Sequence, residues 1–183
     1  MMRSSRAKRN SNEFMTFFKD WIIPILIAVL VANLVTKYVL FKVLIPSESM
    51  YPTLEKGDQL FATMIYNHDK IKRGDMIVFK FDQDGKDETL IKRVIGLPGD
   101  EVVVKPNGEV YVNNEELDEP YKVQGNTQPG YFQVPDGKYL FLGDNRNNSY
   151  DSRFWKDPYI DKSNIIAKAR VRVYPFNRMK FFD

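Results

Sequence analysis

The chain begins with a polar, basic stretch and then becomes almost wholly apolar. Residues 21–36 carry no charge, and extending this run to residue 41 gives 21 residues with Lys37 as the only charge. About 20 apolar residues are needed to cross the hydrocarbon core of a bilayer. The pattern predicts a transmembrane helix over residues 21–41, preceded by a basic tail (1–20) and followed by a polar body (42–183).

In the body, hydrophobic positions occur in short runs rich in β-branched and aromatic residues, separated by Pro, Gly, Asn and Asp. Such runs are typical of β-strands, and no long amphipathic helix competes with them. Asn107-Gly108 favours a hairpin, and residues 97–100 favour a second turn. We expect an all-β body with strands at 59–65, 76–81, 89–95, 101–104, 110–113, 138–142 and 165–174.

Charge is distributed unevenly about Pro46. The 183 residues have a formal net charge of +3, but residues 1–45 hold seven basic and two acidic side chains, whereas the rest hold 20 and 22. The slightly acidic body argues against a nucleic-acid partner. The basic leader indicates a cytoplasmic N-terminus and a body outside the cytoplasm. A cleavable signal peptide and a buried helix are the alternatives, but the run is long for a signal peptide and no Ala-x-Ala pattern follows it.

Residue composition narrows the possible chemistry. The chain has no Cys and one His, which excludes disulfide scaffolds, thiolate zinc sites, cysteine nucleophiles and the two-His HExxH metal site. A Ser-His-Asp triad would depend on His68, which lies in a polar stretch typical of a solvated loop. No GxSxG elbow or phosphate-binding GxxxxGK[ST] loop is present. A serine activated by a lysine remains.

Lys92 is the first candidate for such a base, because it lies in a run that is apolar on both faces of the expected strand. Burial disfavours the charged form and lowers the pKa of a lysine. A free lysine, with a pKa of about 10.4, is neutral only about one part in a thousand near pH 7.5, so a base would need a pKa lower by roughly 2 to 3 units. The alternative is an edge strand whose Lys and Arg discourage aggregation.

Two further segments contain unusual groups of polar residues. Ser49 lies just before Pro52, where a serine commonly caps a helix or turn, and Ser47 supplies a second hydroxyl. The segment Gly143–Arg153 is dense in Asp, Asn, Arg and Ser, which is compatible either with a polar turn or with a shell that holds a catalytic base in place. Residues 147–149 also match a glycosylation sequon, which we interpret as a coincidence.

Taken in order, these segments resemble the type I signal peptidases, membrane-anchored Ser–Lys endopeptidases that remove signal peptides from exported proteins. SESMYPTL, KRVIGLPGD and GDNRNNSYDSR match three boxes of that family, and the Gly74-Asp75 strand lies between the first two. The resemblance covers most of residues 45–153. With one anchor and a short body, the chain resembles the compact form found in Gram-positive bacteria.

The resemblance implies a role for each matching position. Ser49 would be the nucleophile, Lys92 the general base, and Ser47 with the Ser49 amide the oxyanion hole. Ser149 would orient Lys92. The residues that would support the site are Asp144, Arg146, Asp151 and Arg153. The residues that would line a substrate pocket are Ile45, Met50, Leu54, Leu90 and Ile91.

The resemblance also implies an all-β fold of two antiparallel sheets after a single N-terminal transmembrane helix. It implies no metal or organic cofactor. The implied partners are a lipid bilayer and secretory preproteins that carry small residues at positions −1 and −3 before the cleavage site. A self-cleaving Ser–Lys repressor is a weaker interpretation, because those proteins carry a DNA-binding region instead of an apolar span. A catalytically dead β-module that binds extended peptides by strand addition is the alternative from another class.

Overall fold

The computed structural model describes residues 15–83, 85–123, 125 and 127–182. It divides into two compact units, residues 1–40 and 41–183. In the first unit, a continuous helix extends from Met15 to Tyr38 and is, among the described residues, the one helix long and apolar enough to cross a membrane. It contains a π-helical segment η1 (Phe18–Ile22) followed by α2 (Ile23–Tyr38). Pro24 is the second residue of α2, just after η1, and a local π-helical adjustment of this kind accommodates a proline inside a membrane-spanning helix.

The helix begins earlier and ends earlier than the apolar run suggests. Its last residue is Tyr38, because residues 40 to 44 form strand β1 (Leu40–Leu44), which pairs with β2 (Gln59–Met64). The two polar residues near its end bond back to the preceding turn, Asn33 Nδ2 to the Val29 carbonyl at 2.7 Å and Thr36 Oγ1 to the Ala32 carbonyl at 2.9 Å. These bonds give the Asn33 and Thr36 side chains hydrogen-bond partners within the helix, because apolar surroundings would offer them none.

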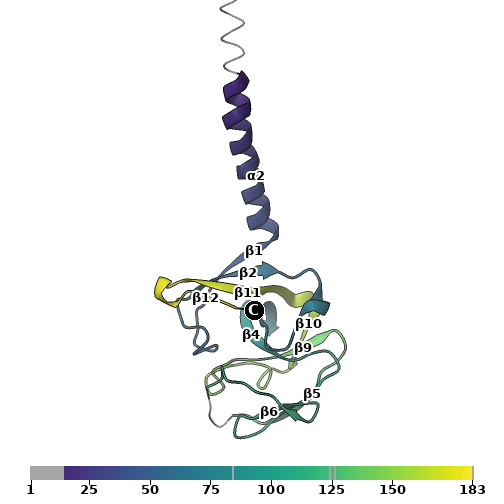
Figure 1. Cartoon of the computed structure of the whole chain (residues 1–183). Coiled ribbons are helices and arrows are strands. Elements are labelled where there is room, and N and C mark those ends of the chain that lie inside the picture. The colour runs from purple at the N-terminus through teal and green to yellow at the C-terminus, as the bar shows by residue number, and fades with distance from the viewer. Residues whose placement is uncertain (1–14, 84, 124, 126, 183) are drawn as a thin grey trace, which may run out of the picture. The chain divides into compact units, whose positions relative to one another are not determined.

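The second unit is all-β and contains two antiparallel sheets, as expected from the sequence (Figure 1). The large sheet has the order β1-β2-β11-β3-β4-β9-β10, with β12 paired to β11. The small sheet has the order β7-β6-β5-β8. The further strand bounds are β3 Met76–Gln83, β4 Lys86–Gly96, β5 Glu101–Val104, β6 Val110–Val112, β7 Glu115–Glu116, β8 Gly130–Gln133, β9 Lys138–Leu142, β10 Tyr159–Asp161, β11 Ile165–Tyr174 and β12 Lys180–Phe181, and the 3₁₀ turns are η2 His68–Lys70, η3 Lys162–Asn164 and η4 Phe176–Arg178.

A common core joins the two sheets. Ile95, Leu140 and Leu142 of the large sheet pack in one cluster with Val102, Val104, Val110 and Val112 of the small sheet. Gly96 ends β4 at this junction, where a Cβ would lie 2.7 Å from Val134 Cγ2. Any larger residue would therefore push the two sheets apart.

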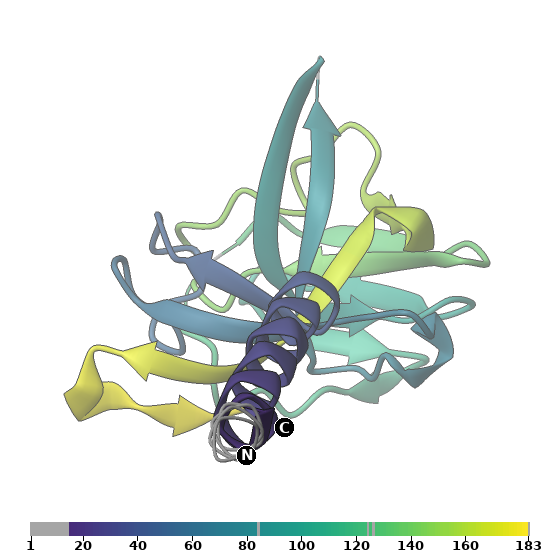
Figure 2. The same cartoon turned by 90° about the horizontal axis from the view of Figure 1, so that it is seen from above.

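Strand pairing brings the three polar segments of the sequence together. β4 lies between β3 and β9, with Lys92 opposite Ile77 and Arg93 opposite Leu142. The edge-strand interpretation of Lys92 is therefore wrong. Because β9 ends at Leu142, the segment that begins at Gly143 starts beside Arg93. Seen from above, β3 and β4 extend together as a long teal ribbon (Figure 2).

Candidate active site

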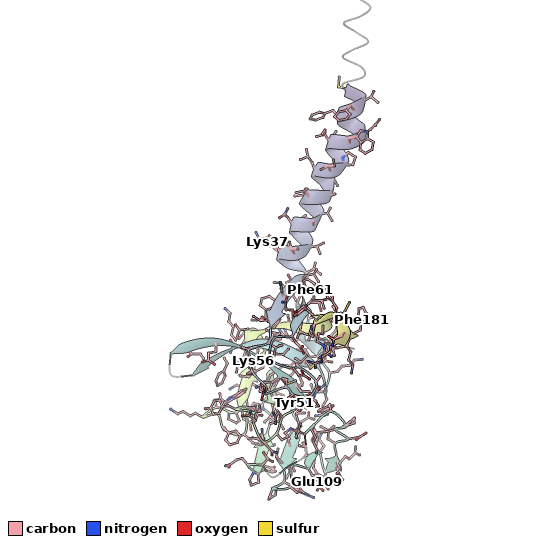
Figure 3. The ribbon with its side chains drawn as sticks, turned by 90° about the vertical axis from the view of Figure 1, so that its left-hand side faces the viewer. Lys37, Tyr51, Lys56, Phe61, Glu109 and Phe181 are labelled. Atoms are coloured by element: carbon pink, nitrogen blue, oxygen red, sulfur yellow. The ribbon has the colours of Figure 1, made fainter. Side chains whose placement is uncertain are left out.

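A lysine and a serine meet directly at the centre of the site. Lys92 Nζ donates a hydrogen bond to Ser49 Oγ at 2.5 Å. Lys92 is only 4% exposed, whereas Ser49 is partly exposed. In Figure 3, Tyr51, two residues after Ser49, lies between Phe61 of the large sheet and Glu109 of the β5–β6 turn. A hydroxyl that solvent can reach is thus held by an amine that solvent cannot reach.

Burial changes the acidity of this amine. The pKa of Lys92 is lowered from 10.5 to about 8, chiefly by loss of hydration. The charges of Asp151 and Asp144 act in the opposite direction, and the positive charge of Arg153 contributes to the lowering. A lysine with this pKa is neutral in an appreciable fraction of molecules near neutral pH. It can therefore accept a proton from a neighbouring hydroxyl, which a solvated lysine rarely does.

A second hydroxyl lies beside the first. Ser47 Oγ donates to Ser49 Oγ at 3.3 Å, and Ser47 is exposed. The turn over residues 48–51, which contains Ser49 and directly follows Ser47, is closed by a bond of 3.0 Å from the Tyr51 amide to the Glu48 carbonyl. The two hydroxyls therefore face the same point at the surface.

A buried ion pair connects the three segments. Arg93, next to Lys92, donates to Asp144 through Nε at 2.8 Å and Nη2 at 2.6 Å, and Thr53 Oγ1 donates to the same carboxylate at 2.5 Å. The ring of Tyr121 stacks on the Arg93 guanidinium with 3.7 Å between them. One carboxylate thus fixes the strand of Lys92 relative to the segment of Ser49.

Two further buried pairs stiffen the loop after β9. Asp151 accepts from Arg153 at 2.8 and 2.7 Å and from the Gly143 amide at 2.9 Å, and Arg153 also donates to the Arg146 carbonyl at 2.9 Å. Arg146 forms a two-pronged pair with Glu119. Buried charges of this kind are tolerated only when they are paired and hydrogen-bonded, as these are.

Comparison with known proteins identifies the family to which the chain belongs. The family model described as signal peptidase, peptidase S26, matches residues 18–174, which is most of the chain. The chain belongs to the signal peptidase family. Its function is that of a type I signal peptidase, and its reaction is that of a serine endopeptidase. Signal peptidases of this family act on preproteins that carry signal peptides.

Individual signal peptidases are similar over most of the chain. A signal peptidase I from Leptolyngbya laminosa is 47% identical over 143 residues, covering 74% of this chain and 69% of the relative. Signal peptidase IB from Staphylococcus aureus strain MRSA252 is 37% identical over 182 residues, covering 88% and 92%. A crystal structure of a signal peptidase I from Enterococcus faecalis is 31% identical, has a TM-score of 0.44, and covers 52% of this chain and 93% of that one.

Ser149 differs from what the signal peptidase resemblance implies. Its hydroxyl is buried and, within the described part of the chain, has no hydrogen-bond partner. The expected bond to Lys92 is therefore absent from this conformation, in which Lys92 instead donates to Ser49. Ser149 nevertheless lies against the site, because a Cβ on Gly143 would overlap both the Ser149 hydroxyl and the Ser49 carbonyl oxygen.

The residues expected to line a substrate pocket occupy two kinds of position. Ile45, Met50 and Leu54 are almost or fully buried in a core cluster that also contains Ile91. Leu90 is half-buried and packs against the cluster on the other side of the sheet. Ile91 and Leu90 thus point to opposite faces, as alternation along a strand requires.

His68 takes no part in the site. It begins the turn η2, and its backbone carbonyl accepts a hydrogen bond of 3.1 Å from the Tyr139 hydroxyl. Among the described residues, no group of three or more His, Asp or Glu side chains could hold a metal ion. The site thus consists of hydroxyls, one amine and buried ion pairs.

Several residues of the site have no counterpart among the sequence-based expectations. Arg93 and Thr53 lie within the matched boxes, but no pattern indicated that both bind Asp144. Glu119 and Tyr121 lie outside the boxes, in a segment with no clear periodicity, and only the fold brings them to Arg146 and Arg93. Asn145 was part of a box without an assigned role, although it contacts the backbone on which Ser49 lies.

Proposed function

We propose that Ser49 is the nucleophile and Lys92 the general base with which this signal peptidase cleaves its substrates. The observation that carries the proposal is the direct contact, 2.5 Å, between the partly exposed Ser49 hydroxyl and a buried lysine. The lowered pKa of Lys92, about 8, supports it, because a base works best when its pKa lies near the working pH.

The reaction proceeds through an acyl-enzyme. Neutral Lys92 accepts the Ser49 proton while Oγ attacks the scissile carbonyl, and the resulting oxyanion is bound by the Ser49 amide and the Ser47 hydroxyl. Lys92 then gives the proton to the departing amine, which leaves with the mature protein. A water molecule that loses a proton to Lys92 hydrolyses the ester, which releases the signal peptide and restores Ser49.

The buried ion pairs keep this geometry from drifting. Asp144 binds Arg93, which directly follows the base, and Thr53, which lies in the same short segment as the nucleophile. Asp151 and Arg153 brace the loop that contains Ser149. Arg146 anchors the same loop to Glu119. Ser149, whose hydroxyl needs a partner, orients Lys92 once the Ser49 proton has been taken and the amine is free to turn.

The substrates are secretory preproteins with small residues at −1 and −3. A shallow apolar pocket bordered by Ile45, Met50, Leu54 and Ile91 accommodates these small side chains, whereas Leu90 packs against the cluster on the opposite face of the sheet and does not line it. The wholly buried Met50 and Leu54 support the floor of this pocket from within the core. Larger side chains at −1 would not fit without disturbing that core.

The apolar helix that ends at Tyr38, which contains most of the predicted span of residues 21–41, anchors the protein in the cytoplasmic membrane as a single pass. Residues 1–20 remain in the cytoplasm and residues 42–183 form the catalytic domain on the outer face. The excess of basic residues before the span supports this orientation. The lipid bilayer is then a lasting partner, and a preprotein held in the same bilayer by its signal peptide is met at a high effective concentration.

The dyad is tested with the full chain in detergent and a purified preprotein whose signal ends in Ala-x-Ala. Wild type and His68→Ala are expected to release mature protein, whereas Ser49→Ala and Lys92→Ala are expected to lose the activity. Cleavage by Ser49→Ala would disprove the assignment of the nucleophile. Cleavage by Lys92→Ala at the wild-type rate would disprove the assignment of the base.

The orientation is tested separately, and the absence of cysteine from the chain makes this simple. Single cysteines replace Ser5 in the tail and the exposed Lys56 in the body, and intact cells are treated with a maleimide that cannot cross membranes. Labelling of Lys56→Cys alone agrees with the proposed orientation. Labelling of Ser5→Cys alone would reverse it.

A further inference from the structure

Asn145 holds the backbone on which Ser49 lies at two points. Its amide N–H donates to the Ser49 carbonyl at 3.1 Å, and its side-chain Nδ2 donates to the Glu48 carbonyl at 3.1 Å. The Glu48 carbonyl also accepts from the Tyr51 amide at 3.0 Å. Both carbonyls that flank Ser49 are thus bound, and the one before it is bound twice.

The Glu48 carbonyl belongs to the same peptide group as the Ser49 N–H. The only cis peptide bonds of the described chain precede Pro52 and Pro175, so this group is trans. In a planar trans peptide the carbonyl and the N–H point in opposite directions. When Asn145 draws the Glu48 oxygen toward itself, the Ser49 N–H must therefore point away from Asn145.

We propose that Asn145 is a positioning residue that aims the Ser49 amide at the oxyanion of the reaction. The inference rests on the proposed function, in which this amide is one of the two oxyanion donors. Besides fixing its direction, a hydrogen bond to the carbonyl polarises the peptide group and strengthens its N–H as a donor. Asn145 therefore acts on the transition state through the backbone, without touching the substrate.

The position of Asn145 is itself determined by its neighbours. Asp144 is fully buried and binds Arg93 and Thr53, and Arg146 is buried and paired with Glu119. The half-buried Asn145 between them has little freedom to move. A donor held this rigidly costs no reorganisation during the reaction, which is the condition for electrostatic stabilisation.

An amide side chain suits this role better than a carboxylate. The groups that flank Ser49 present two carbonyl oxygens to Asn145, and an oxygen facing them would repel them. A negative charge here would also favour protonated Lys92 and oppose an oxyanion nearby. Asn145→Asp keeps the shape of the side chain and the backbone N–H, but it removes the donor and adds the charge.

The test measures catalysis and binding separately in the full chain in detergent. Asn145→Ala is compared with wild type, with Asn145→Gln, which retains an amide, and with Asn148→Ala, an exposed position in the same loop. We expect Asn145→Ala to lower kcat about tenfold with little change in KM, less than the loss of a whole oxyanion donor because the Tyr51 bond remains. Asn145→Gln should recover part of the loss, and Asn148→Ala should match wild type.

Two inhibitors distinguish aiming of the amide from general support of the fold. A signal-peptide analogue with a reduced CH₂–NH bond in place of the scissile amide has no carbonyl oxygen to fill the oxyanion hole, and its affinity should change less than twofold in Asn145→Ala. A peptide boronate forms a bond from Ser49 Oγ to boron, gives its negative tetrahedral oxygens to the hole, and should bind about tenfold more weakly.

Two results would overturn the inference. One is a kcat for Asn145→Ala within twofold of wild type. The other is evidence of a distorted site or an altered base, seen either as an equal loss of affinity for both inhibitors or as a shifted acid limb in the pH profile. Neither result bears on the proposed roles of Ser49 and Lys92, because Ser49→Ala and Lys92→Ala test those roles separately.

Discussion

At the scale of single residues, the site depends on keeping water away from one amine while leaving one hydroxyl accessible. Lys92 is buried on an interior strand, and loss of hydration is the largest cause of its lowered pKa. Histidine could serve as a base without such burial, because its ordinary pKa already lies near neutrality. A lysine acquires the same property only within a folded core.

The activity should therefore follow the ionisation of Lys92. Protonated lysine cannot accept the Ser49 proton, so kcat/KM is expected to fall about tenfold per pH unit below the pKa of about 8 and to level off above it. Cleavage of a short signal peptide followed between pH 5.5 and 9.5 gives this profile. An acid limb near pH 6.5 instead would indicate that a histidine controls the reaction.

Gly143 should not tolerate even the smallest side chain. A Cβ at this position would overlap the Ser49 carbonyl oxygen, which is backbone, and the Ser149 hydroxyl. Gly143→Ala is expected to displace Ser49 from Lys92 and to reduce cleavage by at least about a hundredfold, since misplacement of about 1 Å costs that much. Gly130→Ala, which meets only the ring end of Phe132, is the matched control for the preprotein assay and should remain active.

Much of the site could be predicted from the sequence, because its reactive residues lie in distinctive boxes. Ser49 and Lys92 meet as the boxes imply, and the ion pairs of Asp144, Asp151, Arg146 and Arg153 are buried beside them. The role of Asn145 could not be predicted, because it depends on the direction of backbone carbonyls, which no residue pattern records. The unpartnered hydroxyl of Ser149 depends on packing at the same atomic detail.

At the scale of elements, the ability to predict a strand depended on its position in the sheet. β5, β9 and β11 have the bounds expected from the sequence, since each combines a run of β-branched or aromatic residues with clear turns. β1, β7, β8, β10 and β12 were not expected. Each of them pairs with a single neighbouring strand, and at such edges pairing rather than local preference makes a strand.

The Arg93–Asp144 ion pair connects strand β4 to the loop after β9 and so holds the site together. Asp144→Asn leaves a buried guanidinium without its counter-charge, and we expect it to lower the free energy of unfolding by about 3 to 5 kcal/mol. Asp157→Asn, which removes an exposed partner of Lys138, should cost less than about 1 kcal/mol. Urea unfolding of both variants measures the difference, and equal losses would show that the buried pair has no special weight.

At the scale of the whole molecule, the large sheet is completed by β11, a strand that comes late in the sequence. β11 inserts between β2 and β3, which are neighbours in sequence but not in the sheet. Ala167 and Ala169 of β11 pack in the same cluster as Met50 and Leu54, and Arg172 donates to the Thr53 carbonyl at 2.8 Å. The segment that contains Ser49 is therefore held in place by residues that lie more than a hundred positions further along the sequence.

Shortened chains should reveal this dependence. A chain ending at Asn164 lacks β11 and leaves β2 and β3 without the strand between them, so it should be digested rapidly by trypsin and show no cooperative unfolding. A chain ending at Tyr174 lacks only η4 and β12 and should keep a resistant body, with lower stability because the Arg178 bond to Asp58 is lost. Comparable resistance of the two chains would contradict the central place of β11.

The late position of β11 also bears on how the protein is made. A ribosome delivers the strands in numerical order, so Ser49 and Lys92 have both been synthesised while the strand that completes their sheet is still missing. Pairings this distant in sequence form slowly, since a long loop must close first. A nascent copy should therefore remain catalytically inactive until β11 has emerged from the ribosome and can insert between β2 and β3.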